Sequence, residues 1–498
     1  MKKLLALALA LVLSLGVVSF AAAEEPFEIT VMLPQFPTTN DFDPDNNPVL
    51  DKIEELSGVR LKITWAPNSE YETLFSSMLA DKNPPMVVVA QDARAATVLA
   101  SARKGAFWDL TDFIADAENY PYLAQGNAGI YNNISVDGRV YGIFRTRDFP
   151  RGGAYYRVDI AKEMGFDKEV QTIDDLTELA EKLNAYSADT YALNMCEYVE
   201  GTVQYITILF GAPNTWGIDE EGNVYPAHES PAYLEGLNWL RSLYANKGID
   251  PNFITAPSGS WNDAERNDKA FMRFDCLDNA HRQQEWFEQN KGTTEIIWKA
   301  IGPVAKADGT ISQWAQNPGF SGEVIINKKT DNRNGVTEED LPKVVKFLDW
   351  CNGPEGQLLL NGGLEDLTYV VDEDGFRSNA GLEEANDKYV ANLNQLNMGV
   401  PGDLAKPGVK QTELRLRYRE LLAELTPYAV SNPCYPYDSE TSNNYGNQLK
   451  TLLNDAAANY IAGNIDEAGL RAMWQQWSDE GGAKMTQEYN DAYHAAQQ

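Results

Sequence analysis

The sequence is poor in histidine, cysteine and positive charge, and these shortages exclude several classes of protein. Its 498 residues include 3 histidines, which leave little material for histidine-rich metal or acid–base chemistry. Lysine and arginine number 41 against 73 acidic residues, giving a net charge of −32. A surface this anionic repels phosphate backbones, so we expect no nucleic-acid partner. With 43% apolar and 23% charged residues, the composition is typical of a folded chain of two or more domains.

Long apolar runs are also lacking, except at the N-terminus. Lys2 and Lys3 precede the apolar run Leu4–Val18, and three alanines at 21–23 form a small-residue cleavage site. This pattern predicts a signal peptide over residues 1–23. No lipid-anchor cysteine follows it, since the first cysteine is Cys196. We therefore expect an exported protein, periplasmic or extracellular, with no second membrane-spanning segment.

The cysteines give no sign of a metal site. They are about 80 residues apart and form no CxxC pair or cluster of the kind that binds zinc. Buried free thiols are one interpretation, and one or two disulfides, which export would permit, are the other. The residues concerned are Cys196, Cys276, Cys351 and Cys434.

The first hundred residues after the signal peptide alternate strand and helix patterns. Apolar residues alternate over 27–33 and 61–65, and residues 86–90 are wholly apolar. Helical patterns at about 49–57 and 71–82 lie between them. This order predicts a parallel sheet, with ligands bound beyond the carboxyl ends of its strands. The loops there are short, polar and rich in amides, which suits a neutral polar ligand.

The rest of the chain continues as α/β and ends helical. Asp137-Gly138 predicts a hairpin turn, and Thr172 with Asp175 predicts a capping box. Further expected elements are helices near 230–246 and 280–290, a strand at 323–327, a helix from Pro342 and a mainly helical region beyond about 380.

Motifs for common enzyme chemistries are absent from the sequence. There is no Walker A motif, no GxGxxG and no HExxH, and Gly319–Gly322 falls short of GxSxG. The sequence does not exclude a pair of carboxylates for glycoside hydrolysis, because it does not give the distance between any two acidic side chains. A secreted polysaccharide-degrading enzyme is therefore one function that stays open.

Several short motifs, in order along nearly the whole chain, carry a family resemblance. They are Leu56-Ser57-Gly58-Val59, Leu79–Pro85, Gly138–Ile143, Tyr156–Asp159, Thr172–Leu176, Leu348–Gly356 with Asp374-Gly375, and the tail from Tyr445 through Trp474 to Ala492-Tyr493. Together they resemble the extracellular solute-binding proteins of family 1, which are the sugar-binding components of ABC importers, and most closely the large branch that includes alginate-oligosaccharide binders.

The resemblance implies a fold, a domain division and partners. The fold would be α/β, of the two-lobed, type II periplasmic-binding-protein kind. Residues 24–147 and 321–368 would form the N-terminal lobe, and 148–320 and 369–498 the C-terminal lobe with a helical tail. A monomer would carry an oligosaccharide in the inter-lobe cleft to the transmembrane subunits of an ABC permease, without cofactor or metal. The same fold could instead bind peptides or other polar solutes.

The resemblance leaves the acidic segment Asp219–Asn223 open to two interpretations. Calcium-carrying members have an acidic loop near this position. The segment lacks EF-hand spacing, which favours an ordinary β-turn.

We expect the cleft to use aromatic rings in polar stretches together with nearby carboxylates and amides, because sugars present apolar faces and hydroxyl edges. The substrate-binding candidates are Phe36, Asn40, Tyr71, Asp92, Trp216, Trp261, Asp275 and Trp314.

Four arginines stand out at the expected crossing between the lobes. Arg145, Arg147, Arg151 and Arg157 fall within thirteen residues of an otherwise anionic chain. They either form a salt-bridge cluster that stiffens the hinge, or one or two of them bind an acidic sugar. Arg147 and Arg157 are our candidates for the second role, since a planar guanidinium can pair bidentately with a carboxylate.

Overall fold

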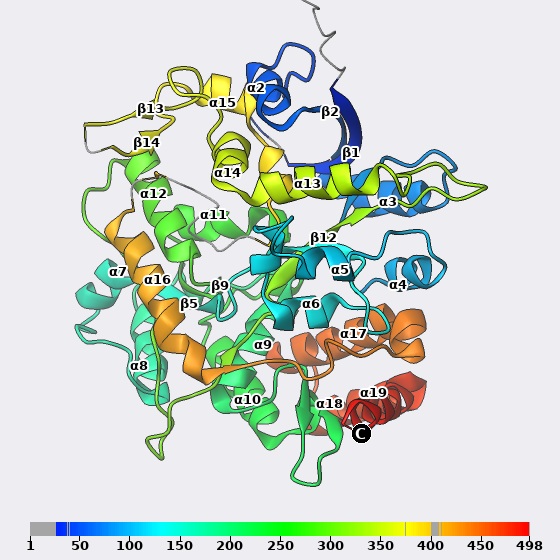
Figure 1. Ribbon diagram of the computed structural model, residues 1–498. Coiled ribbons are helices and arrows are strands. Elements are labelled where there is room, and N and C mark those ends of the chain that lie inside the picture. The colour runs from blue at the N-terminus through cyan, green and yellow to red at the C-terminus, as the bar shows by residue number, and fades with distance from the viewer. Residues whose placement is uncertain are drawn as a thin grey trace, which may run out of the picture.

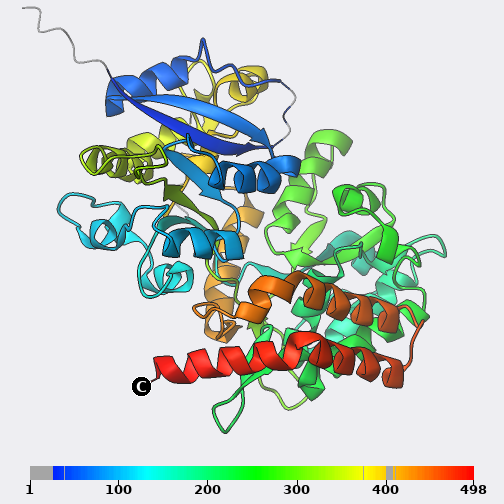
Figure 2. The same cartoon turned by 90° about the vertical axis from the view of Figure 1, so that its right-hand side faces the viewer.

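The computed structural model describes residues 26–36, 38, 40–373, 375–399, 408–409 and 411–497. The chain forms two lobes, each built on its own sheet and hydrophobic core (Figures 1 and 2). The two-lobed α/β prediction is therefore confirmed. The expected signal peptide lies outside the described residues, and none of the described helices has the length and apolar character that a membrane span requires.

The first lobe contains a five-stranded sheet in the order β2-β1-β3-β12-β4. Strands β1, β2 and β3 are parallel, as the sequence predicted, whereas β12 pairs antiparallel with β3 and β4. The strands are β1 (Phe27–Gln35), β2 (Val59–Pro67), β3 (Val87–Ala90), β4 (Gly142–Thr146) and β12 (Phe320–Ile326). Helices around this sheet are α2 (Pro48–Ser57), α3 (Tyr71–Leu79), α4 (Ala96–Arg103), α5 (Thr111–Ala115), α6 (Ala128–Ile134), α13 (Leu341–Asn352) and α14 (Pro354–Asn361).

The second lobe contains a four-stranded sheet in the order β10-β5-β9-β6. Its strands are β5 (Gly152–Arg157), β6 (Tyr191–Leu193), β9 (Ala270–Cys276) and β10 (Trp298–Ala300), and a small hairpin joins β7 (Trp216–Ile218) to β8 (Val224–Pro226). Its helices are α7 (Val158–Glu163), α8 (Ile173–Asn184), α9 (Val199–Phe210), α10 (Pro231–Ala245), α11 (Trp261–Arg266) and α12 (Asn279–Lys291). The predicted capping box opens α8: the Thr172 side chain and Asp175 each accept from the other's backbone N–H.

The C-terminal region is mainly helical, as expected. It comprises α16 (Glu413–Leu425), the short strand β15 (Ala429–Val430), α17 (Glu440–Ile461), α18 (Glu467–Trp477) and α19 (Ala483–Ala496). Strand β15 pairs with β11 (Trp314–Ala315) of the second lobe, and α17 packs on α10. The last three helices therefore extend the second lobe (Figure 2).

The expected lobe boundary at residue 369 does not agree with the packing. Strands β13 (Val370–Val371) and β14 (Arg377–Ser378) precede α15 (Glu383–Tyr389), which contacts α2 of the first lobe. After it, Val390, Leu393, Leu396 and Met398 are buried in the first lobe's core. The chain has rejoined the second lobe by α16, which contacts α12. Apolar side chains that fit the first core, rather than a composition break, decide where the crossing lies.

Two shorter predictions are confirmed. Asp137 and Gly138 both have positive φ, 52° and 76°, as a type I′ turn requires. All four cysteines are free thiols, three of them buried, which supports the interpretation without disulfides.

Candidate ligand-binding cleft

A cavity of about 660 Å³ lies between the two lobes, and we call it the inter-lobe pocket. The first lobe contributes Asp92 and the residues that lead into α4, up to Thr97. The second lobe contributes one face of α9, the loop 432–437 and the first turns of α17. Because its walls belong to different lobes, the shape of the pocket depends on how the lobes sit against each other.

One face of α9 lines the pocket. Glu200, Val203, Gln204 and Thr207 line it, and a spacing of three or four residues places them on the same side of a helix. Glu200 pairs with Lys450 of α17, with 2.6 Å between the carboxylate and the ammonium group. The helix therefore presents an amide, a hydroxyl and a neutralised carboxylate to the pocket.

The start of α17 forms another part of the lining and is rich in amides. Asn443, Asn444, Asn447 and Gln448 line the pocket beside Tyr445, which is 54% exposed. Ser439 caps this helix by accepting the N–H of Ser442. Glu488 of α19 accepts from the Ser439 hydroxyl and the Thr441 N–H, which fixes the helix start. Side-chain amides and a tyrosine ring on a fixed helix suit a ligand that has hydroxyl edges and apolar faces.

Two arginines near α4 tie the first lobe to the loop before α17. Arg94 donates to the carbonyl oxygens of Ser135 (2.7 Å) and Tyr437 (3.1 Å). Arg103 pairs with Asp438 (2.7 Å) and with Asp137 of its own lobe (3.0 Å). Since Arg94 and Tyr437 both line the pocket, this contact lies at its rim.

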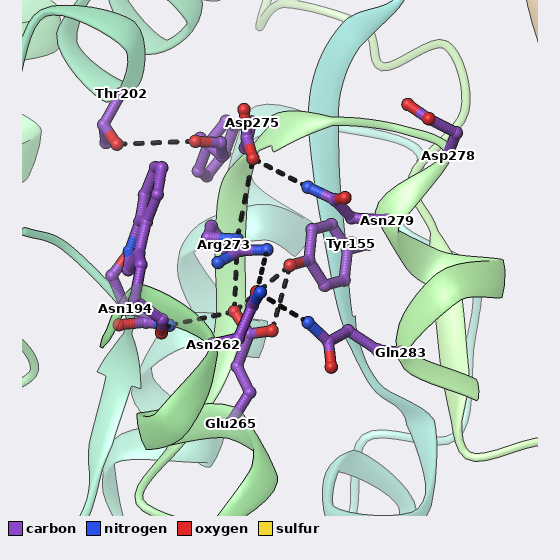
Figure 3. A network of polar contacts seen from close by, with 12 residues as sticks. Tyr155, Asn194, Thr202, Asn262, Glu265, Arg273, Asp275, Asp278, Asn279 and Gln283 are labelled. Atoms are coloured by element: carbon purple, nitrogen blue, oxygen red, sulfur yellow. Dashed lines mark hydrogen bonds and ion pairs between the residues drawn. The ribbon is translucent and has the colours of Figure 1, made fainter. Parts of the chain in front are cut away.

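A buried ionic network underlies the cleft wall of the second lobe (Figure 3). Glu265 is fully buried, and it accepts from the Tyr155 hydroxyl (3.0 Å) and the Asn194 amide (2.9 Å). The Arg273 guanidinium lies 3.2 Å from the same carboxylate. Burial raises the pKa of Glu265, and the charge of Arg273 opposes that rise.

This network holds Trp261 at the surface. The Arg273 guanidinium lies 4.5 Å from the centre of the Trp261 ring, and Asn194 donates to the Trp261 carbonyl. Trp261 is partly exposed and makes an edge contact with Tyr198, which is 49% exposed and comes just before α9. Neither ring is among the residues that line the inter-lobe pocket, and Trp261 instead lines a second cavity with Tyr191 and Asn194 of the same lobe. We call the pair the aromatic platform.

Near the pocket, the first lobe contains a buried acid that has fewer hydrogen-bond partners than Glu265. Glu323 on β12 is buried, and one of its carboxylate oxygens has no hydrogen-bond partner among the described residues. Burial raises its pKa to about 8; the nearby Arg94 opposes the rise and Asp92 adds to it. Gly142 on the adjacent strand makes room for this side chain, since a Cβ there would collide with it. Glu323 is therefore largely protonated at neutral pH.

Two of the expected ligand contacts line the inter-lobe pocket, and others lie elsewhere on the second lobe or at the crossing. Asp92 and Trp216 line the inter-lobe pocket, although Trp216 is mostly buried beneath it. Trp261 belongs to the aromatic platform. Asp275 is the last residue but one of β9, is partly exposed, and accepts from Asn279 (2.7 Å; Figure 3). Like Trp261, it is not among the residues that line the inter-lobe pocket. Arg147, between β4 and β5, does not line it either and donates to the Thr146 carbonyl (2.9 Å). As ligand contacts they remain proposals.

Two expected contacts lie elsewhere on the first lobe. Phe36 is 41% exposed and exchanges backbone hydrogen bonds with the Asn392 side chain. The backbone of Asn40 donates to Asp387. Neither residue is among those that line the inter-lobe pocket.

Three expected contacts are buried inside a lobe, so we no longer propose them. Tyr71 is fully buried, and its hydroxyl donates to the Val89 carbonyl. Trp314 packs on Gly153, where a Cβ would leave the ring no room. Arg157 is paired with Asp159 and Asp268 at the end of β5 remote from the crossing, about 17 Å along the strand from Gly152. Each had a polar or turn-rich sequence context, which does not reveal which way a side chain points.

The sequence argument missed the first turns of α17 and the loop before it. Tyr435, Tyr445 and the neighbouring amides line the pocket, although none of them was among the candidates. The signal was present in Ser442-Asn443-Asn444-Tyr445, an aromatic residue among amides. A helical tail far along the chain gave no reason to place that stretch at the cleft.

The acidic segment at 219–223 forms the β7–β8 hairpin turn. The Asp219 carboxylate accepts the Asn223 N–H, and Gly222 has a φ of 87°. Across the part of the chain that the structure describes, no group of three or more histidine, cysteine or acidic side chains is arranged to hold a metal ion.

Comparisons with known proteins agree with this architecture. The family model described as bacterial extracellular solute-binding protein matches residues 49–368. Lipoprotein LipO of Bacillus subtilis is 30% identical over 469 residues, covering 91% of this chain and 90% of that protein. The polygalacturonan/rhamnogalacturonan-binding protein YtcQ of the same organism is 26% identical over 460 residues, covering 91% of this chain and 89% of that protein.

Solved structures share the fold. The crystal structure of the alginate-binding protein AlgQ2 without calcium ion matches with a TM-score of 0.69 at 16% identity, covering 95% of this chain and 98% of that one. The S. pneumoniae substrate-binding protein FusA in complex with kestose gives 0.66 at 16% identity, covering 94% and 99%. The two lobes, the pocket between them and these matches lead to one conclusion: this chain belongs to the bacterial extracellular solute-binding protein family.

Proposed function

We propose that this protein is the extracytoplasmic receptor of an ABC importer and that it binds an oligosaccharide in the inter-lobe pocket. The observation that carries the proposal is the lining of that pocket: tyrosine rings and side-chain amides of the second lobe face Asp92, Arg94 and Thr97 of the first lobe. Its volume of about 660 Å³ falls within the range of small-ligand sites. The names of the relatives, which include a polysaccharide-binding protein and a receptor in complex with kestose, point to the same ligand class.

The binding mechanism follows from the two-sided pocket. A ligand that touches both Asp92 and the start of α17 makes its full set of contacts only when the lobes are close together. It therefore shifts the population of the protein toward the closed state. A permease that recognises the closed state would accept the loaded receptor. No bond is broken in this cycle.

We propose that the protein acts outside the cytoplasm, as a monomer. The signal-peptide pattern of residues 1–23 supports export.

A glycan panel tests the function. We expect at least one neutral or acidic oligosaccharide to raise the melting temperature, because a ligand at 100 times its Kd stabilises the native state by about 2.7 kcal/mol. No new reducing ends should form on prolonged incubation. Turnover abolished by a single carboxylate substitution would instead establish an enzyme, and an unresponsive panel would count against a sugar receptor.

Tyr445→Ala localises the binding site. Loss of an exposed ring that stacks on the ligand should weaken affinity about 10-fold, measured by titration calorimetry. Tyr428→Ala is the matched control, because Tyr428 is 36% exposed and does not line the pocket. Equal affinities for the two variants would place the ligand elsewhere.

A further inference from the structure

The inter-lobe pocket has a part that belongs to the second lobe alone. Where the lobes meet, its lining includes Asp92 and Thr97 of the first lobe and the amide-rich start of α17. Other lining side chains of the second lobe are each less than one-tenth exposed, and we call this part the inner end. Its walls are Trp216 at the start of β7, His228 in the helical turn after β8, Cys434, Leu449 of α17, Trp477 at the end of α18 and Met485 of α19.

The aromatic rings of the inner end contact one another. The centre of the His228 ring lies 4.6 Å from that of Trp477, at an interplanar angle of 82°. The ring centres of Trp216 and Trp477 are 6.4 Å apart. Both tryptophans belong to one hydrophobic cluster with Cys434, Leu449 and Met485. The walls are therefore apolar apart from the nitrogen atoms of these rings and the Cys434 thiol.

The ring nitrogens of the inner end have no partners in the protein. Among the described residues, no hydrogen bond involves the imidazole of His228 or the indole N–H groups of Trp216 and Trp477. The indole nitrogens of Trp298 and Trp314 also lack a partner, but packing encloses those two completely. The nitrogens of the inner end are not enclosed in this way, and their rings line the pocket. Such groups are unfavourable in a buried place unless a partner from solution supplies the hydrogen bond.

The inner end is uncharged at neutral pH. Burial alone lowers the pKa of His228 to about 4, and burial raises the pKa of the Cys434 thiol to about 12. The neutral imidazole offers one donor and one acceptor, and each indole offers one donor. A carboxylate placed here would lose its hydration without gaining a cation. A sugar hydroxyl needs only donors and acceptors, and the apolar face of a sugar ring suits an indole.

We infer that the inner end is a subsite for one uncharged sugar unit, and that His228, Trp216 and Trp477 form hydrogen bonds with its hydroxyl groups. This inference rests on the proposed function, and it names the residues that select the unit. All of the walls belong to the second lobe, so the subsite does not depend on how the lobes sit against each other. Charged units of the same chain would have to lie nearer the first lobe.

Substitution of His228 in the full chain tests its role. His228→Phe keeps a ring of similar size and removes both nitrogens, whereas His228→Gln keeps a donor and an acceptor. The probes are tetrasaccharides of glucose, galactose, mannose and xylose, titrated by calorimetry. For those that bind the wild type, we expect His228→Phe to lose about 10-fold in affinity and His228→Gln to lose less.

The melting temperature separates a binding role from a structural one. The nitrogens of His228 have no partner among the described residues, so replacing them by carbon breaks no hydrogen bond of the unliganded protein. Unliganded His228→Phe should therefore melt no lower than the wild type. A lower melting temperature together with unchanged affinity would mean that His228 serves the fold.

Two tryptophans of α18 give a matched pair of variants. Trp477→Phe removes an indole N–H at the pocket, and we expect a loss of about 10-fold in affinity for the same probes. Trp474→Phe makes the same change in a ring that lies 5.5 Å from His228 but does not line the pocket. Its affinity should equal that of the wild type. Melting curves establish that both variants are folded.

Paired ligands test the charge of the unit. Tetramers of galacturonate, glucuronate and mannuronate carry a carboxylate on every unit, and their methyl esters keep the rings without the charge. In every pair that binds, we expect the ester to bind at least 10-fold more tightly than the acid, because one unit of the acid would place its charge in the inner end.

The outcomes separate the two proposals. Unchanged affinity in His228→Phe and Trp477→Phe, equal losses in Trp477→Phe and Trp474→Phe, or an acid that binds as tightly as its ester would overturn the inference and leave the sugar receptor standing. No binding of any oligosaccharide would overturn the proposed function, and the inference with it.

Discussion

The two walls of the cleft rest on opposite treatments of a buried carboxylate. In the second lobe, Glu265 has a cation, a hydroxyl and an amide around it, and it supports the aromatic platform through Arg273. In the first lobe, Glu323 is equally enclosed, but one of its carboxylate oxygens has no hydrogen-bond partner among the described residues. A buried acid that has hydrogen-bond and ion-pair partners holds the surrounding residues in one arrangement. Burial raises the pKa of an acid without such partners, and the acid therefore stays neutral. The second wall should therefore be rigid at any pH near neutrality, and the first should respond to pH.

The largest expected effect is on the second wall. Glu265→Ala leaves the Arg273 charge buried without its anion, so the free energy of unfolding should fall by about 3–5 kcal/mol, measured by urea denaturation. Trp261 fluorescence should also change as its support is lost. Asp263→Ala, in the same helix but exposed, is the control. A loss below about 1 kcal/mol would mean that the network is not what stabilises this wall.

The first wall should show a pH dependence of the opposite sense to that of an ordinary paired carboxylate. The native pKa of Glu323, about 8, is above its ordinary value of 4.5, so the native state binds the proton more tightly than the unfolded state. Its contribution to stability is complete below about 4.5 and is lost as the pH rises toward 8.

Glu323→Gln removes that dependence. The variant should match the wild type near pH 4.5 and exceed it at pH 8, by up to roughly 4 kcal/mol in the free energy of unfolding. Denaturation at both pH values measures the difference, with the exposed Glu338→Gln as control. A variant less stable than the wild type at pH 8 would show that the carboxylate is ionised and paired in solution.

The smallest effect concerns the contact between the walls. The Arg103 side chain is 39% exposed, so Arg103→Ala should cost about 1 kcal/mol or less. It removes the pair with Asp438 across the lobes, and the unliganded protein should therefore open, with a larger radius of gyration in X-ray scattering. Lys52→Ala, which breaks a pair within α2, should leave the radius unchanged. An unchanged radius for Arg103→Ala would mean that Arg94 alone sets the spacing.

The comparison of predicted and observed features shows which of them a local sequence pattern is sufficient to predict. The capping box at Thr172, the Asp137-Gly138 turn and the apolar run of β3 depend on neighbours in sequence, and all three formed as predicted. Asp92 was predicted to be near the ligand because it follows the carboxyl end of a strand in a parallel sheet, where ligands of such folds bind. Tyr71 and Trp314 failed because their cavities are made by residues remote in sequence.

By itself, the sequence determined the alternating strands and helices, the wide spacing of the cysteines, the anionic surface and the family. Each of these depends on local periodicity, on composition or on ordered motifs. Tertiary structure alone decided that Val390, Leu393, Leu396 and Met398 join the first core, that the start of α17 lines the pocket, and that Arg157 pairs with Asp159 and Asp268 inside the second lobe. Those outcomes depend on which surfaces meet, because burial and charge pairing are set by contacts between segments hundreds of residues apart.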